Sequence, residues 1–225
     1  MLYAIGDIHG RLDKLEELLA RLPLRDDDRL VFLGDYVDRG PESRGVVDRL
    51  IRVGEERSSV FLLGNHESMF LDFLGWQGTQ YFGADVFLAN GGAETLLSYD
   101  YFDAPEPRPT RFELPAAHAD FFRSLRTHHV DGDFLFVHAG LGRALARSDH
   151  VDQALRRARS EELLWDRSTM DLPHRLGVTI VYGHTPRADF SVRWNQPYSI
   201  GIDTGAVYGG PLTAIRLPDE TIFQA

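Results

Sequence analysis

Short apolar runs that end in a polar residue recur along this chain. Rich in Val, Ile, Leu and Phe, and often followed by glycine, they are typical of buried β-strands. They cover residues 3–5, 30–33, 60–63, 134–137 and 178–182. Between the first three, apolar residues spaced three and four apart predict a helix over 12–22, ended by Pro23, and another over 46–53, ended by Gly54. Alternating strands and helices indicate an α/β domain.

The middle and the end of the chain follow other patterns. Residues 69–125 are rich in aromatic side chains, and we expect them to be mostly helical, with a proline-rich loop over 100–115 that walls a substrate cleft. Four later strands are expected to form a meander that closes a second sheet, over 190–194, 198–203, 212–217 and 221–224. A length of 225 residues fits one domain, so we interpret 1–225 as a single domain with 69–125 as a helical and loop elaboration.

Composition removes several classes of protein. The absence of cysteine excludes disulfides, thiolate metal sites and cysteine nucleophiles. A formal net charge of −10 argues against bulk attraction to nucleic acid or anionic membranes. No apolar stretch reaches the roughly 18 residues that span a bilayer, and the first residues show no leader pattern. We expect a cytoplasmic protein without nucleic acid or membrane partners, and the sequence leaves its oligomeric state open.

Potential metal ligands stand at or just after the ends of the predicted strands. Ligands bind beyond the carboxyl ends of strands in open α/β sheets, so these side chains are candidates for one site. Carboxylates, imidazoles and one amide without sulfur suit Mn, Fe or Zn. Six ligands exceed what one catalytic metal needs and fit two metals about 3.5–4 Å apart. The six are Asp7, His9, Asp35, Asn65, His138 and His184.

Ordered motifs around these residues resemble a known family. Gly6-Asp7-Ile8-His9-Gly10, Gly34-Asp35-Tyr36-Val37-Asp38-Arg39-Gly40 and Gly64-Asn65-His66-Glu67 are similar to the three signatures of the phosphoprotein phosphatases, within the calcineurin-like metallophosphoesterases. With the later His138-Ala139-Gly140 and Gly183-His184-Thr185, the order resembles small bacterial and lambda-type bacteriophage serine/threonine protein phosphatases. The resemblance implies an α/β catalytic domain with two mixed β-sheets packed as a sandwich and flanked by helices.

The resemblance also implies residue roles. Asp7 and His9 would bind the first of two divalent metal ions, Asp35 would bridge, and Asn65, His138 and His184 would bind the second. Mn²⁺ is the expected ion, with Fe, Zn or Ni as alternatives. A metal-bridging hydroxide would attack phosphorus directly. His66, oriented and kept cationic by Asp38, would protonate the leaving oxygen, while Arg39 and Arg167 would bind the phosphoryl oxygens.

Three functions compete. The first is a metal-dependent phosphoric monoester hydrolase, a serine/threonine protein phosphatase acting on phosphoproteins or small phosphate esters. The alternative is a symmetrical dinucleoside polyphosphate hydrolase on the same fold. Those enzymes commonly carry Val-Ala-Arg-Gly and Gly-Asn-His-Asp where this chain has Val-Asp-Arg-Gly at 37–40 and Gly-Asn-His-Glu at 64–67, which favours the phosphatase. A non-catalytic scaffold is disfavoured because every ligand is present.

Four further features have two interpretations each. Tyr208 either overhangs the cleft or packs on the sheet, and Asn90-Gly91-Gly92 either lines the pocket or starts a helix. Glu67 is interpreted as structural rather than catalytic. Arg156, Arg157 and Arg159, followed by Glu161 and Glu162, are predicted to form a solvated helix face with internal ion pairs rather than a basic docking strip.

Overall fold

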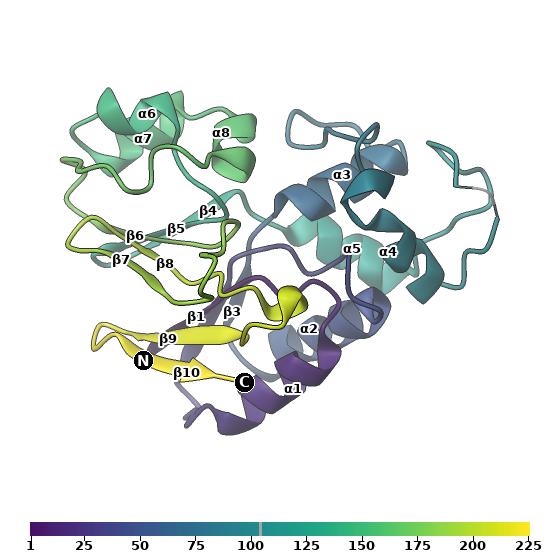
Figure 1. Ribbon diagram of the computed structural model, residues 1–225, viewed down its shortest axis with the longest axis horizontal. Coiled ribbons are helices and arrows are strands. Elements are labelled where there is room, and N and C mark those ends of the chain that lie inside the picture. The colour runs from purple at the N-terminus through teal and green to yellow at the C-terminus, as the bar shows by residue number, and fades with distance from the viewer. Residues whose placement is uncertain (104) are drawn as a thin grey trace.

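Two five-stranded β-sheets lie face to face in the computed structural model, with helices on both outer sides (Figure 1). This architecture confirms the predicted α/β sandwich of two mixed sheets. The structure describes residues 1–103 and 105–225. Ala104, within the predicted elaboration 69–125, lies outside the described residues.

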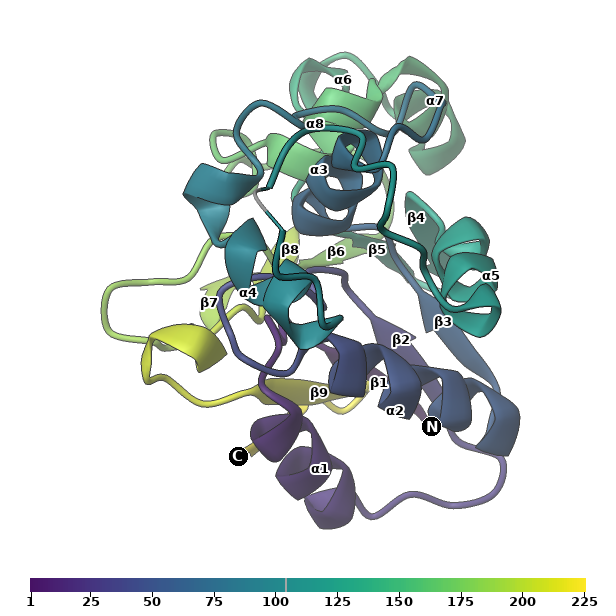
Figure 2. The same ribbon diagram turned by 90° about the vertical axis from the view of Figure 1, so that its right-hand side faces the viewer.

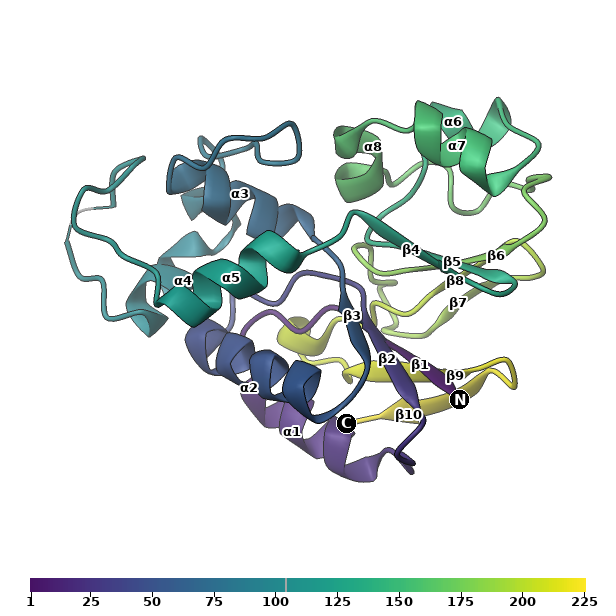
Figure 3. The same ribbon diagram turned by 180° about the vertical axis from the view of Figure 1, so that it is seen from behind.

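The first sheet has the strand order β10-β9-β1-β2-β3. Strands β1, β2 and β3 are parallel, with β3 at the edge, whereas β9 pairs antiparallel with β1 and β10 pairs antiparallel with β9. Helices α1 and α2 connect the parallel strands and cover the outer side of this sheet (Figure 3). The bounds are β1 (Leu2–Ile5), α1 (Leu12–Arg21), β2 (Arg29–Phe32), α2 (Ser43–Glu56), β3 (Ser59–Phe61), β9 (Thr213–Leu217) and β10 (Thr221–Gln224).

The second sheet has the order β4-β5-β6-β8-β7. Strands β5, β6 and β8 are parallel, and β4 and β7 pair antiparallel at the two edges. Three short helices cover its outer side (Figure 3). The bounds are β4 (His128–Asp131), β5 (Phe134–Val137), α6 (Arg143–Ala146), α7 (Val151–Arg157), α8 (Ser160–Trp165), β6 (Thr179–Tyr182), β7 (Arg193–Asn195) and β8 (Ser199–Gly201).

Of the remaining helices, α4 and α5 both contact α2 (Figure 2). These remaining helices are α3 (Asn65–Phe73), the 3₁₀ turn η1 (Leu88–Asn90), α4 (Gly92–Ser98) and α5 (Ala116–Ser124). A second 3₁₀ turn, η2 (Ala206–Tyr208), precedes β9. Long connections separate α3 from η1 and α4 from α5, so the expectation that residues 69–125 are mostly helical is wrong.

Apolar side chains form three buried layers. One lies between the two sheets and includes Val31, Phe136 and Ile200. Another lies between the second sheet and α6–α8. The largest joins the first sheet to α1 and α2 and continues into the aromatic residues of 69–125, such as Phe70 and Phe122. These layers fix the sheets against each other, and with them the strand ends that carry the predicted ligands.

Two further sequence predictions need correction, and one strand was not predicted. Strands β9 and β10 do not close the second sheet: they form a hairpin on the first sheet, because β9 pairs with β1. Helix α2 does not end at Gly54 but continues to Glu56. Gly54 faces the Phe61 ring, and a Cβ atom at this position would lie only 3.3 Å from that ring. Strand β4 was not predicted, since His128-His129-Val130-Asp131 lacks an apolar run and its pairing with β5 creates it.

Among the described residues, no helix has the length and apolar character needed to cross a membrane.

Candidate metal centre

The polar residues at the strand ends meet in one buried place. Asp7 and His9 follow β1, Asp35 follows β2, His138 follows β5 and His184 follows β6. Asn65 is the first residue of α3, just beyond β3. All six are at most 5% exposed. The structure therefore brings together every residue that the sequence predicted as a metal ligand.

One group of these donors surrounds His138. Its Nδ1 lies 2.9 Å from the Leu33 carbonyl oxygen and donates to it, so Nε2 of the neutral ring is a lone-pair acceptor. This Nε2 lies 2.9 Å from Asn65 Oδ1, 3.2 Å from His184 Nδ1 and 3.4 Å from Asp35 Oδ1. Acceptor atoms converging this closely repel one another unless a cation or a proton lies between them, so the donor set fits a metal ion.

The second group surrounds His9. Nδ1 of His9 donates to the Val37 carbonyl at 2.9 Å, which leaves Nε2 as an acceptor 3.5 Å from Asp35 Oδ2. Asp35 thus directs one oxygen to His138 and the other to His9. Two clusters that could each hold a metal share Asp35: His9, Asp35 and His66, and Asp35, His138 and His184. A carboxylate shared between two donor clusters is the arrangement that a bridging ligand requires.

Asp7 contacts the backbone of His184. Its Oδ2 accepts the His184 backbone N–H at 2.9 Å, and Oδ1 is buried without a hydrogen-bond partner among the described residues. Burial raises the pKa of Asp7 well above its usual value, and the nearby carboxylates of Asp203 and Asp35 raise it further. A buried carboxylate oxygen without a partner beside two more carboxylates is a place where a cation would be stabilised.

Electrostatics keep several of these groups in the form that binds metal. Burial lowers the pKa of His184 to about 2 and lowers that of His9 well below its usual value. Both rings are therefore neutral, and each keeps a nitrogen lone pair that can bind a metal ion. Burial alone would raise the pKa of Asp35, but the neighbouring His138 and His66 hold it well below its usual range. Asp35 is therefore an anion, and although burial alone would lower the pKa of His138, the Asp35 carboxylate raises it above its ordinary value, so this ring holds a proton more readily than His9 or His184.

The backbone at the site is strained. His9, Asp35, Asp38, Arg39 and His184 all have positive φ, between 48° and 71°. For residues other than glycine this costs about 1–3 kcal/mol each and is concentrated at functional sites. The Asp7 carboxylate lies so close to the backbone of residue 183 that only glycine fits there, since a Cβ on Gly183 would lie 2.1 Å from Asp7 Oδ1.

His66 and Asp38 form a buried pair. His66 Nδ1 lies 2.6 Å from Asp38 Oδ2, and the Thr95 hydroxyl donates to Asp38 Oδ1 at 2.6 Å. The Asp38 backbone N–H donates to Thr95 Oγ1 at 2.8 Å and Ser43 Oγ at 3.1 Å. Burial raises the pKa of Asp38 and lowers that of His66 to about 4, so the expectation that Asp38 keeps His66 cationic has no support from the pKa of His66.

Thr95 and Ser43 were not predicted. Both are fully buried, and their hydroxyl groups lie 3.0 Å apart. Thr95 comes from α4 and reaches Asp38 across 57 positions of sequence. Ser43 is the first residue of α2, and nothing in the sequence near Ser43 or Thr95 indicated these contacts.

Glu67 has the structural position that the sequence predicted. Its carboxylate accepts four backbone N–H groups, from Asp35 at 2.8 Å, Tyr36 at 2.7 Å, Val37 at 3.1 Å and Gly64 at 3.0 Å. It thereby ties the loop after β2 to the start of α3.

The two predicted phosphate-binding arginines lie at the border of the site. Arg39 NH1 is 2.7 Å from His9 Nε2, and its guanidinium carbon is 5.5 Å from the centre of the Tyr208 ring. Tyr208 is 53% exposed, so it overhangs Arg39 rather than packing on the sheet. Arg167 NH1 donates to Thr185 Oγ1 at 3.4 Å, beside His184.

The turn at Asn90-Gly91-Gly92 and the proline-rich segment differ in what they contact. Gly91 has φ of 94° and precedes α4, and its carbonyl accepts the Arg39 backbone N–H at 3.0 Å. The turn thus both starts a helix and borders the site. In the proline-rich segment the Phe112 ring contacts Phe70 and Tyr99, and the role of this segment as a wall of the substrate cleft stays a prediction. Trp165, which was not predicted at the site, has its ring centre 6.0 Å from that of His184.

Comparison with known proteins identifies a family and two similar enzymes. The sequence profile of the calcineurin-like phosphoesterases matches residues 2–209. The chain is 28% identical to an asymmetrical bis(5′-nucleosyl)-tetraphosphatase of Anoxybacillus flavithermus, over 97% of this chain and 91% of that protein. It is 26% identical to a symmetrical bis(5′-nucleosyl)-tetraphosphatase of Nitrosospira multiformis, over 99% of this chain and 94% of the other.

Solved structures agree on the fold. A crystal structure of a protein named as a diadenosine tetraphosphatase superposes with a TM-score of 0.69 at 26% identity, covering 100% of this chain and 92% of the other. A serine/threonine phosphatase of Saccharomyces cerevisiae superposes with a TM-score of 0.64 at 17% identity, covering 100% of this chain and 79% of the other, and shows likeness of fold alone. With a profile match over most of its length, this chain belongs to the calcineurin-like phosphoesterases, a family of hydrolases whose chemistry implies divalent metal ions.

Proposed function

We propose that this protein is a metal-dependent hydrolase that cleaves the phosphoanhydride bond of dinucleoside polyphosphates. The observation that carries the proposal is the likeness, over nearly the whole of both chains, to relatives named bis(5′-nucleosyl)-tetraphosphatases. The motifs at 37–40 and 64–67 favoured a protein phosphatase, but the relatives match the alternative better. Full-length likeness weighs more than two motif positions because it includes the segments that border the site.

The donor set supports a centre for two divalent ions, with Mn²⁺ as the expected ion. Asp35 would be shared between them. When bound, such ions neutralise phosphoryl charge and supply a nucleophile from water at neutral pH. The proposed ligands are Asp7, His9, Asp35, Asn65, His138 and His184.

Two arginines would hold the substrate. The guanidinium groups of Arg39 and Arg167 lie at the border of the donor clusters, and phosphoryl oxygens are the anions that guanidinium binds best. Arg39 now contacts His9 Nε2, the atom assigned to a metal. Side-chain rotation toward the phosphate chain would free that atom and place two N–H donors on a phosphoryl oxygen.

The His66–Asp38 pair would supply a proton to the leaving group. If Asp38 is protonated, it donates to Nδ1 and the neutral ring carries its hydrogen on Nε2. If the proton lies on Nδ1 instead, the ring is cationic and Nε2 still carries a hydrogen. Whether the shared proton lies on Asp38 or on His66 Nδ1, His66 Nε2 carries a hydrogen. The pair can therefore donate a proton from Nε2 although burial disfavours the cationic form of His66.

This pair is also the observation that favours a second candidate, a serine/threonine phosphatase. An alkoxide is a poor leaving group and requires protonation, whereas a nucleotide phosphate leaves as a stable anion. A buried proton donor braced by Thr95 is therefore of more use to a phosphomonoesterase than to an anhydride hydrolase.

Product analysis tests the proposal. Diadenosine tetraphosphate would be incubated with the Mn²⁺-loaded protein and the nucleotides separated by chromatography. ADP alone would show symmetrical cleavage, and ATP with AMP would show asymmetrical cleavage. Both outcomes support the proposed function, and Asp35→Asn is the control for a contaminating enzyme. Intact dinucleotide alongside rapid release of phosphate from a phosphothreonine peptide would overturn it.

A further inference from the structure

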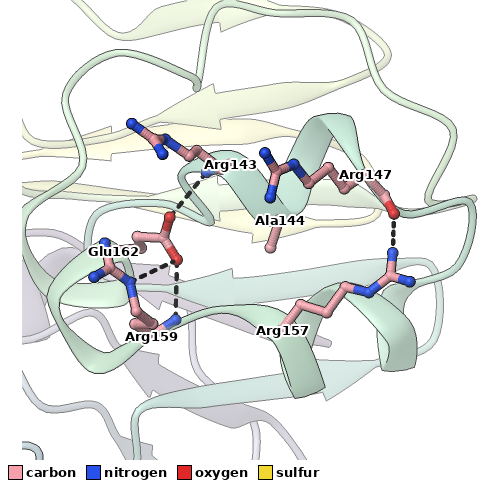
Figure 4. Close-up of a pocket in the computed structure, with 6 residues that line it drawn as sticks. All are labelled: Arg143, Ala144, Arg147, Arg157, Arg159 and Glu162. Carbon is pink, nitrogen blue, oxygen red and sulfur yellow. Dashed lines mark hydrogen bonds and ion pairs between the residues drawn. The ribbon is translucent and has the colours of Figure 1, made fainter.

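A pocket lined by arginines lies among the short helices on the outer side of the second sheet (Figure 4). Its volume is about 720 Å³, within the range of small-molecule sites. Residues of α6 form one side of the pocket, and the end of α7 with the start of α8 forms the other. The lining residues are Arg143, Ala144, Arg147, Arg157, Arg159 and Glu162, none of which belongs to the candidate metal centre.

The one carboxylate of the pocket is already used. Glu162 Oε1 accepts the backbone N–H of Arg143 at 3.0 Å, and Oε2 accepts that of Arg159 at 3.0 Å. The Arg159 side chain is paired, with Nε 3.8 Å from Glu162 and NH1 3.3 Å from Glu161. Of the predicted set, Arg159 alone forms such an ion pair with a described residue, and it lies between α7 and α8, so the prediction of one continuous helix face is wrong. The pairing compensates one of the four guanidinium charges.

The other three guanidinium groups have no carboxylate partner in the part of the chain that the structure describes. Arg157 NH1 donates to the backbone carbonyl of Arg147, and to Ser148 Oγ at 3.5 Å. The Arg143 and Arg147 side chains, both exposed, make no hydrogen bond or ion pair with any described residue. In a chain with a formal net charge of −10, three unpaired cations around one hollow are a local reversal of charge. A bound anion would relieve their mutual repulsion.

We propose that Arg143, Arg147 and Arg157 bind a chain of phosphates, at a site apart from the metal centre. Guanidinium groups form bidentate bonds with phosphate oxygens and are weakly hydrated, which suits them to this ligand. Ala144 is the one apolar residue in the lining, so the groups that can recognise a ligand here are mainly guanidinium groups. Several guanidinium groups around one cavity match an anion with several charges, such as a nucleoside polyphosphate or inorganic polyphosphate.

Direct binding measurements test this site independently of hydrolysis. Inorganic tripolyphosphate would be titrated calorimetrically into the full chain, freed of metal by chelation and dialysis because the probe itself binds metal ions. Arg147→Ala removes a side chain that makes no hydrogen bond or ion pair with any described residue, and loss of its charge-assisted bonds to the ligand should weaken binding about tenfold or more. Arg156→Ala is the matched control, since Arg156 is equally exposed, neighbours Arg157 and does not line the pocket.

The control should stay within about twofold of the wild type, as for an exposed charge without direct contact. Equal weakening by Arg147→Ala and Arg156→Ala would overturn the site, because it would mean general charge attraction. Orthophosphate binding as tightly as tripolyphosphate would overturn the claim for a phosphate chain. ATP binding more tightly than tripolyphosphate would assign the site to nucleotides, and equal binding would assign it to the phosphate chain alone. Melting temperatures verify folding, and kcat for p-nitrophenyl phosphate should not change in Arg147→Ala.

Discussion

Removal of the Thr95 hydroxyl tests how the proton-donating pair is held. Thr95→Val keeps the shape of the side chain but removes the 2.6 Å hydrogen bond to Asp38 Oδ1. The change also removes the 2.8 Å bond from the Asp38 backbone N–H, which keeps Ser43 Oγ as an acceptor at 3.1 Å, and the 3.0 Å contact with the Ser43 hydroxyl. These two losses involve neutral groups, so only the loss at the carboxyl group should depend on pH. A hydrogen bond to a charged group contributes about 1.5–3 kcal/mol, and that is the expected loss in the free energy of unfolding when Asp38 is ionised.

The loss should depend on pH. Burial raises the pKa of Asp38 in the folded protein well above its ordinary value of 3.8, and the Thr95 hydrogen bond opposes this rise. The folded state therefore binds more protons than the unfolded state above pH 3.8, and its stability falls as pH increases through the folded-state pKa. Thr95→Val raises that pKa further, so the stability difference from the wild type should grow with pH.

Urea unfolding of wild type, Thr95→Val and Thr95→Ser at pH 4 and pH 8 measures this effect. Thr95→Ser keeps the hydroxyl and removes one buried methyl group, which costs about 1 kcal/mol at either pH. The loss in the free energy of unfolding for Thr95→Val could be no larger than that for Thr95→Ser, or it could be the same at both pH values. Either result would refute the claim that the Thr95 hydroxyl stabilises the ionised Asp38 carboxylate.

Three further changes test the proposed centre. Asp35→Asn should abolish two-metal binding and activity together, as measured by metal analysis and turnover; an active variant with two metals would contradict the bridging assignment. Asp38→Asn should lower kcat for alkyl phosphates by about 10²–10⁴-fold, but much less for p-nitrophenyl phosphate, because only the poorer leaving group needs the proton of His66. Equal losses on both would remove the acid role. Gly183→Ala should displace the Asp7 carboxylate and weaken Mn²⁺ binding about 10- to 100-fold in a titration, and unchanged affinity would count against Asp7 as a ligand.

Much of the fold was predictable because β1, β2, β5 and β6 are buried over most of their length. Their apolar runs end at the turn that carries the ligand, so Asp7, Asp35, His138 and His184 could be placed at one edge before the sheets were known. The edge strands were harder. Strand β4 is half-exposed and depends on its neighbour, and the choice of sheet for the β9–β10 hairpin is decided by pairing between residues far apart in sequence. The single-domain organisation stays a prediction.

At the site too, residues within a sequence motif could be predicted, whereas contacts between residues far apart in sequence could not. Motif residues such as His66 and Asp38 could be named because their neighbours in sequence carry the pattern. Thr95 could not be named, since its contact with Asp38 requires the turn before α4 to pack against the Arg39 loop. The arginine pocket also depends on tertiary structure: Arg143 and Arg147 precede α7 by several residues and meet Arg157 only when α6 packs beside it.

Substrate preference tests the central claim most directly. The Mn²⁺-loaded protein would be assayed for kcat/KM on diadenosine tetraphosphate and on a phosphothreonine peptide under the same conditions. The proposed function predicts a clear preference for the dinucleotide. A higher kcat/KM for the peptide would contradict it and assign the protein to the phosphomonoesterases, with the same metal ligands in place.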